Sequence, residues 1–228
     1  MGNEARLRAF LALDHPEATG EAIARIQGRL RREIPGGMRW ADPQGIHLTL
    51  KFFGDVTMDQ AMRAVAALEP LAAATAPFSL ALAGLGGFPD LRHPRVLWLG
   101  LTGETARLLA FHQTLEQALW EIGFPREERP FRPHLTLARL KPGGPRGLTG
   151  LDRGMTKGGQ AEKPFCAPSL SLMRSTLMPQ GAIYTRLQGI PLTAEEGGRK
   201  DFDATGKATT HSGEGGGYGD GSGQDKGG

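Results

Sequence analysis

The 228-residue sequence contains a single cysteine, Cys166, so an internal disulfide bond is excluded. A recognisable signal peptide is also missing, and together these absences predict a protein of the reducing cytoplasm. No apolar run approaches the ~20 residues that a membrane-spanning helix needs, so we expect no membrane partner. Cys166 lies in a proline-flanked segment without a motif around it, which disfavours a nucleophilic role for its thiol.

Phosphate-binding glycine loops are absent as well. The sequence has 34 glycines, but none of them forms a GxGxxG loop between a strand and a helix, and there is no Walker loop. Nucleotide-dependent chemistry of those kinds is therefore disfavoured, and we expect no cofactor.

The glycines gather at the C-terminal end, where 12 of the 34 lie between Gly197 and Gly228. This stretch has hardly any apolar residues and cannot bury enough surface to offset the entropy of ordering it. We therefore predict a folded domain over residues 1–193 and a disordered tail over residues 194–228. The tail holds 4 basic and 7 acidic residues, which leaves 23 of the 27 basic and 17 of the 24 acidic residues in the domain, a net charge of +6. Such a balance is compatible with an anionic partner, for example a phosphate ester or RNA.

Hydrophobic periodicity predicts an α+β fold rather than a regular parallel βαβ array. Strands are expected at residues 6–13, 47–53, 78–85, 95–101, 134–140, 169–177 and 182–188, and helices at residues 17–34, 57–74 and about 104–122. The second helix should be capped by Thr57 or Asp59 and should present Met62 to the core. Pro70 should kink this helix or end it early.

One four-residue motif occurs twice. His-Leu-Thr-Leu stands at residues 47–50 and again at residues 134–137, 87 positions later. On a strand, successive side chains point to opposite faces, so the leucines of each motif would pack into the core. His47 and Thr49, and likewise His134 and Thr136, would stand on the open face, about 7 Å apart along each strand.

If the two motifs face each other across a cleft, two imidazoles and two hydroxyls surround one small volume. A phosphate diester fits such a site, because in-line displacement at phosphorus needs a base for the incoming water and an acid for the departing oxygen. Imidazole suits both tasks, since its pKa of about 6.5 leaves both protonation states populated near neutral pH. Threonine hydroxyls can hold the non-bridging oxygens. A zinc site would need further ligands, and the motif strands supply Thr, Lys and Leu instead, so we expect no metal.

The doubled H-x-T-x pattern resembles the two-histidine phosphoesterase superfamily and, more narrowly, the bacterial RNA 2',3'-cyclic phosphodiesterases, also called 2'-5' RNA ligases. The resemblance covers roughly residues 6–192, where RAFLAL, HLTLKFFGDV, PRVLWLGL, FRPHLTLAR and SLSLMRSTLMPQGAIYTRL follow in the family's order. It implies two lobes related by a pseudo-twofold axis, each an antiparallel sheet with helices outside, and a cleft between them. It also implies that His47 is the proton donor to the leaving 3'-oxygen and His134 the proton acceptor that activates water. The near-symmetry of the motifs does not by itself distinguish these two roles.

Strand parity adds candidates for binding the substrate. Lys51 has the parity of the first motif's histidine and threonine, and Arg132 has the parity of the second motif's. Arg139 has the opposite parity and should face away unless a β-bulge intervenes. Phe10 or Phe131 is a candidate for stacking on a base.

Several alternatives remain open at this level. One is a non-catalytic module that binds RNA ends or nucleotides, and another is the same chemistry on a small cyclic nucleotide or an ADP-ribose cyclic phosphate. The reverse reaction, 2'-5' joining of RNA ends, is allowed by microscopic reversibility. We expect a monomer that acts on RNA ends carrying a 2',3'-cyclic phosphate. The remaining histidines are interpreted as structural or solvated: His15, His93, His112 and His211.

Overall fold

The computed structural model describes residues 5–34, 36–145, 147–148, 151, 163–178, 181–194, 201–202 and 208–209. The chain divides into two units, Met1–Glu195 and Glu196–Gly228. In the second unit, β10 (Asp201–Phe202) pairs with β11 (Ala208–Thr209). The predicted boundary at residue 193 and the predicted disorder of the tail stay predictions.

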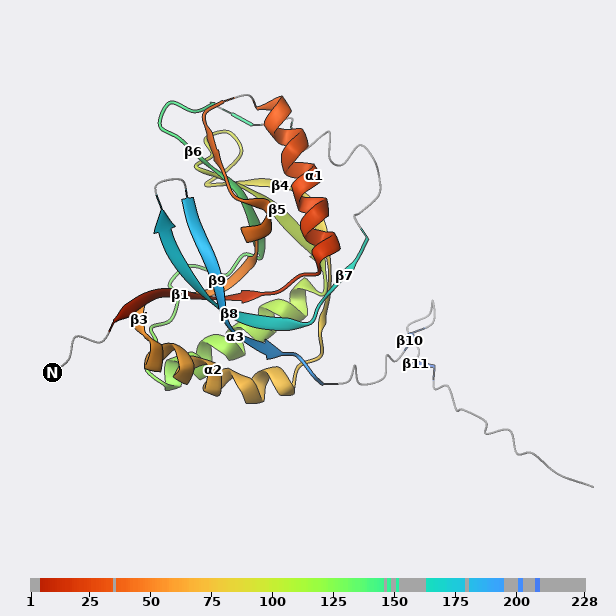
Figure 1. Cartoon of the computed structure of the whole chain (residues 1–228). Coiled ribbons are helices and arrows are strands. Elements are labelled where there is room, and N and C mark those ends of the chain that lie inside the picture. Colours follow the sequence, from red (N-terminus) through yellow and green to blue (C-terminus); the bar gives the residue numbers. More distant parts are fainter. Residues whose placement is uncertain are drawn as a thin grey trace, which may run out of the picture. The chain divides into compact units, whose positions relative to one another are not determined.

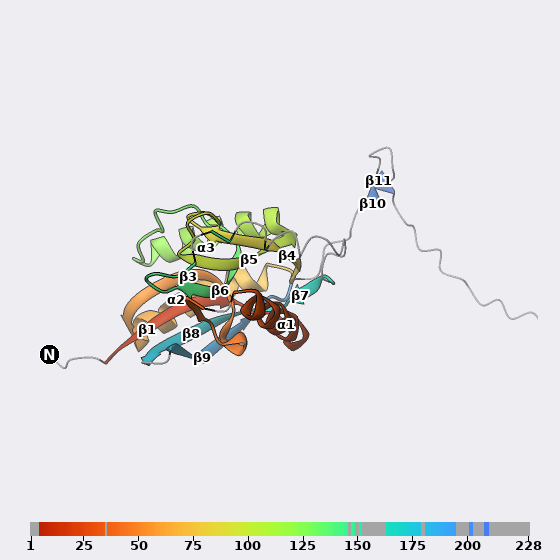
Figure 2. The same ribbon diagram turned by 90° about the horizontal axis from the view of Figure 1, so that it is seen from above.

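Nine of the described strands of the first unit form one curled antiparallel sheet (Figures 1 and 2). They are β1 (Arg6–Leu13), β2 (Met38–Trp40), β3 (Leu48–Thr57), β4 (Phe78–Phe88), β5 (Val96–Gly103), β6 (His134–Leu140), β7 (Phe165–Ala167), β8 (Ser169–Met178) and β9 (Gly181–Pro191). The strand order is β7-β4-β5-β6-β3-β1-β8-β9, and β2 also pairs with β6. The sheet therefore has a β6 half (β7, β4, β5, β6) and a β3 half (β3, β1, β8, β9). The two motif strands, β3 and β6, meet at its centre.

The described part of the first unit has three α-helices that cover the sheet: α1 (Glu17–Glu33), α2 (Met58–Ala73) and α3 (Thr105–Glu121). Two of these helices contact the motif strand of the opposite half of the sheet. Helix α1 follows β1 of the β3 half and contacts β6, and helix α3 follows β5 of the β6 half and contacts β3. The Gln27 side chain on α1 donates to the carbonyl of Leu137 in β6, at 3.1 Å. The His112 ring on α3 is hydrogen-bonded to the carbonyl of Leu50 in β3, at 2.8 Å. Both bonds reach the second leucine of a motif, which confirms the predicted pseudo-twofold arrangement with helices outside the sheet.

Helix α2 lies beside α3 (Figure 1) and packs on the β3 half. Its capping box confirms Thr57 as the N-cap, with Gln60 as the reciprocal partner. The prediction for Met62 is wrong, since its side chain is 41% exposed and the buried face is formed largely by alanines. Pro70 does not end the helix early, because it lies in the last turn and its carbonyl accepts the N–H of Ala74 at 3.1 Å.

The leucines of both motifs lie in one hydrophobic core shared by the two halves. All four are at most 3% exposed: Leu48, Leu50, Leu135 and Leu137. This burial fixes which face of each motif strand points away from the core. None of the described helices is long and apolar enough to cross a membrane.

Candidate active site

The sheet register brings the two motifs together. The first leucines of the two motifs, Leu48 and Leu135, are direct partners in the β3–β6 ladder. Continuing this antiparallel register by one residue in each direction sets the histidine of each motif opposite the threonine of the other. Because the leucines face the core, the two histidines and two threonines share the opposite face. Residues diagonal to each other in an undistorted ladder lie about 7–8 Å apart, so this register would place the imidazoles of His47 and His134 around one small volume.

Both imidazole rings are held in the same way. His47 Nδ1 lies 2.7 Å from the carbonyl of Gly45, and His134 Nδ1 lies 2.6 Å from the carbonyl of Arg132. A carbonyl oxygen only accepts, so Nδ1 carries the proton and donates in both rings. The Nε2 atom is then a free base in the neutral ring and a proton donor in the imidazolium. Each ring is therefore prepared for either half of an acid–base pair.

Aromatic side chains surround His47. Its ring stacks on Phe10 with a centroid distance of 4.4 Å and an interplanar angle of 22°, and Tyr184 meets it edge-on at 5.0 Å. This burial lowers the pKa of His47 below 6.5, because the charged ring is desolvated, and the hydrogen bond to the backbone opposes the shift. The neutral ring is thereby favoured in the free protein.

His134 has an equivalent aromatic cover. Phe88 meets its ring edge-on at 4.9 Å and Trp98 lies at 6.0 Å. The Trp98 indole lies over Gly86, where an added Cβ would be 2.1 Å from the ring, so only glycine fits there. Desolvation lowers the pKa of His134 as well, and the nearby charge of Arg139 lowers it further.

A bulge in β3 corrects the prediction for Lys51. The residues of β1 that pair with Thr49 and Lys51 are neighbours, so Leu50 has no partner and the side-chain alternation is reversed beyond it. Lys51 is consequently buried, 3% exposed, and its Nζ lies 2.8 Å from Glu116 Oε2 and 2.6 Å from the carbonyl of Pro125. The expectation that this ammonium group stands beside the motif is wrong.

A matching bulge in β6 changes the face on which Arg139 lies. Thr136 and Ala138 pair with neighbouring residues of β5, so Leu137 has no partner in β5 and the alternation is again reversed. Arg139 therefore shares the face of His134, and its charge is close enough to affect the pKa of that ring. The bulge that the sequence analysis named as a condition is present. No feature of the local sequence reveals it.

The remaining candidates for binding the substrate are one arginine and two phenylalanines. Arg132 is exposed just before β6, and within the described residues its side chain has no hydrogen bond or ion pair, so it stays a candidate phosphate ligand. The expectation for Phe10 is wrong, because its ring is 1% exposed and is covered by His47. One face of Phe131 is occupied by His112, at a centroid distance of 3.9 Å, and His112 is buried as a structural residue.

Among the described residues, no group of three or more His, Cys, Asp or Glu side chains is arranged to hold a metal.

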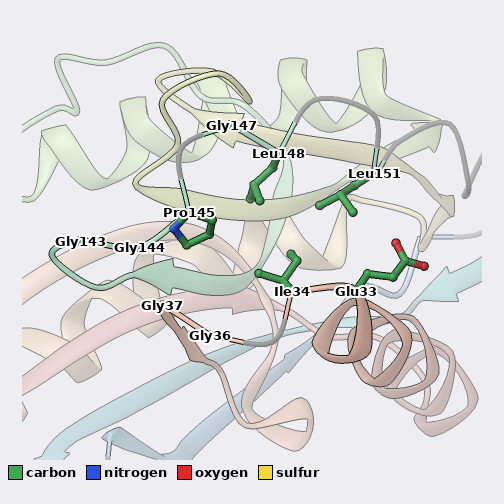
Figure 3. Close-up of a pocket in the computed structure, with 10 residues that line it drawn as sticks. All are labelled: Glu33, Ile34, Gly36, Gly37, Gly143, Gly144, Pro145, Gly147, Leu148 and Leu151. Carbon is green, nitrogen blue, oxygen red and sulfur yellow. The ribbon is translucent and has the colours of Figure 1, made fainter.

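A pocket of about 400 Å³ adjoins His47. It is lined by residues of β1, the segment that follows β1, the segment before β3, β8 and β9, among them Asp14, His15, Asp42, Gln44, Met173 and Tyr184. Another pocket, of about 490 Å³, lies between the end of α1 and residues 143–145, 147–148 and 151, and none of the candidate residues lines it. Figure 3 shows Ile34, Leu148 and Leu151 turned toward one another in it, and its lining is mainly glycine and apolar. Of these two pockets, the one beside His47 therefore carries most of the polar and titratable side chains.

Comparison with known families agrees with this geometry. The family described as the 2'-5' RNA ligase superfamily matches residues 14–146, more than half of the chain. The chain belongs to this superfamily.

The similarity of this superfamily member extends to proteins with assigned activity. It is 35% identical over 185 residues to a protein of Methanothermobacter thermautotrophicus named RNA 2',3'-cyclic phosphodiesterase, covering 80% of this chain and 97% of the relative. It is 32% identical over 198 residues to a Thermus thermophilus protein of the same name, covering 84% and 93%.

Solved structures show the same fold. A crystal structure of a Thermus thermophilus protein matches with a TM-score of 0.69 and 29% identity, covering 83% of this chain and all of that one. The E. coli LigT protein in complex with 3'-AMP matches with a TM-score of 0.63 and 25% identity, with the same coverage.

Proposed function

We propose that this chain is an RNA 2',3'-cyclic phosphodiesterase, a hydrolase that opens a terminal 2',3'-cyclic phosphate to a 2'-phosphomonoester. The observation that carries the proposal is the pairing of the two HLTL strands at the centre of the sheet, with both imidazoles anchored through Nδ1. The names of the two relatives support the same activity.

The reaction follows from two Nε2 atoms on opposite sides of one phosphorus. His134 takes a proton from water, and the water oxygen forms a bond to phosphorus. The bond from phosphorus to the 3'-oxygen breaks, and His47 donates its Nε2 proton to that oxygen. The phosphate remains on the 2'-oxygen. The scheme requires neither a metal nor a cofactor.

Polar side chains around the pair would hold the phosphate. Thr49 and Thr136 stand opposite the histidines on the same face and would donate to the non-bridging oxygens. Arg139, brought to this face by the bulge, and the exposed Arg132 would add positive charge.

The proposed partner is an RNA end, and we place the enzyme as a monomer in the cytoplasm, which the single cysteine supports. Joining of RNA ends through a 2'-5' linkage is the reverse of the same chemistry. A module that only binds RNA would not need two imidazoles that are both anchored through Nδ1, so the catalytic function is favoured.

The test uses an oligonucleotide ending in a 2',3'-cyclic phosphate, incubated with the protein in EDTA. We expect turnover with a 2'-phosphate product, and a fall of about 100-fold or more in kcat for His47→Ala and for His134→Ala. His93→Ala is the matched control, because His93 lies outside both motif strands. Loss of turnover in EDTA, or full activity in both motif variants, would contradict the proposal, and binding without product would favour the binding module.

A further inference from the structure

The two halves of the sheet differ in where they expose aromatic rings. Among the aromatic side chains that the structure describes, three are exposed: Phe52 (57%), Trp120 (53%) and Tyr184 (37%). Phe52 and Tyr184 both belong to the β3 half. Their rings lie 5.9 Å and 5.2 Å from the ring of Phe10, on which His47 stacks. The exposed rings of the sheet therefore gather on one side of the site, next to His47.

Strand pairing places Phe52 on the same face as His47. It is the direct partner of Phe10 in the β1–β3 ladder, and partners share a face. The bulge at Leu50 brings Phe52 there, and the corresponding bulge in β6 brings Arg139 to the equivalent position. Matching positions thus carry an aromatic ring on the side of His47 and a guanidinium on the side of His134.

An exposed cation lies in the same area. Arg8 pairs with Ser175 of β8, and Ser175 pairs with Tyr184 of β9, so Arg8 and Tyr184 lie in one row across three strands. Arg8 is exposed and forms no ion pair or side-chain hydrogen bond within the described part of the chain. Exposed rings with a free cation on one sheet face are the features by which proteins hold single-stranded nucleic acid, through stacking and phosphate contacts.

We propose that Phe52, Tyr184 and Arg8 form a binding platform for the nucleotides that precede the cyclic phosphate. The two rings stack on bases and Arg8 contacts a backbone phosphate. This inference rests on the proposed function and specifies its substrate as an RNA strand rather than a small cyclic nucleotide.

The platform also sets the direction of the substrate in the site. With the nucleotides on the β3 half, the departing ribose oxygen lies next to His47. Water then reaches phosphorus from the β6 half, next to His134. The position of the platform is therefore an argument for His47 as the acid and His134 as the base that does not depend on the family resemblance.

The test compares kcat/KM for two substrates, a 2',3'-cyclic mononucleotide and a five-nucleotide RNA ending in a 2',3'-cyclic phosphate. We expect the wild type to prefer the oligonucleotide. Phe52→Leu and Tyr184→Leu keep an apolar side chain but remove the aromatic face, so each should lower the ratio of oligonucleotide to mononucleotide kcat/KM by about tenfold. Trp120→Leu, on α3, is the matched control and should retain the wild-type ratio. Arg8→Gln should reduce the slope of log kcat/KM against log salt for the oligonucleotide by about 0.7.

Binding of a fluorescently labelled copy of the same oligonucleotide, followed by anisotropy, separates the two proposals. Absence of turnover on both substrates contradicts the proposed function, while weaker binding by the Phe52 and Tyr184 variants would still support the platform. An unchanged ratio and unchanged binding in those variants overturns the platform. The platform is equally overturned if these substitutions change only the sedimentation coefficient, because the surface is then a contact between copies of the protein.

Discussion

At the scale of single residues, the same two contacts hold both motif histidines, as the proposed acid–base catalysis requires. A backbone carbonyl two residues earlier fixes the Nδ1–H tautomer, and aromatic rings exclude water from one side of the imidazole. The first contact orients Nε2, and the second lowers the pKa of both rings below 6.5. A phosphate anion between the rings would favour their charged forms and raise both pKa values again.

These shifts predict the pH dependence of turnover. Under the proposed assignment of acid and base, the free enzyme needs His47 protonated and His134 neutral, so kcat/KM should fall when pH rises above the pKa of His47 and when pH falls below that of His134. Because both pKa values are lowered, the maximum of kcat/KM should lie below pH 6.5, and the kcat profile should lie at higher pH because the bound phosphate raises both values. Initial rates measured in EDTA across the pH range test this. An alkaline limb of kcat/KM above pH 7 would contradict it.

At the scale of elements, the sequence predicted what regular periodicity controls. The three helices and the motif strands were located from their spacing, and the alternation within HLTL assigned its leucines to the core. The three-residue strands β2 and β7 were missed, because they are too short to show a period. Lys51 and Arg139 were assigned to the wrong faces for one reason. A bulge depends on how a strand pairs with its neighbour, and Leu50 and Leu137 look like ordinary strand residues.

The bulge in β3 turns Lys51 into the interior, so we expect its side chain to stabilise the fold and not to bind the substrate. Its ion pair with Glu116 is buried, with the two side chains 3% and 12% exposed. Lys51→Met should lower the free energy of unfolding by about 3–5 kcal/mol, because the carboxylate is left buried without its cation. Replacing both residues by Met should recover most of the loss, and turnover per folded molecule should stay within a few-fold. Urea unfolding combined with activity assays tests this. If Lys51→Met loses turnover while its free energy of unfolding is unchanged, Lys51 acts in the site.

At the scale of the whole molecule, β9 closes the β3 half and ties it to helix α2. Ile190 and Leu192 are at most 4% exposed. The N–H groups of Thr193 and Ala194 donate to the carbonyl of Ala72 in α2 and to that of Thr75 just after the helix. The described contacts of the first unit thus continue through Ala194, one residue before that unit ends at Glu195. The residues of the proposed platform and the histidine pair lie entirely within the first unit.

Two truncations test whether the first unit carries the activity by itself. A chain ending at Glu195 should keep the Tm within a few degrees and kcat/KM within about twofold, because every residue assigned to the site and to its packing is retained. A chain ending at Gln188 loses Ile190 and Leu192 from the core and should be less stable by about 4 kcal/mol. Thermal unfolding and oligonucleotide hydrolysis are measured on both. If the chain ending at Glu195 is stable but hydrolyses the oligonucleotide much more slowly than the full chain, residues beyond it take part in binding RNA.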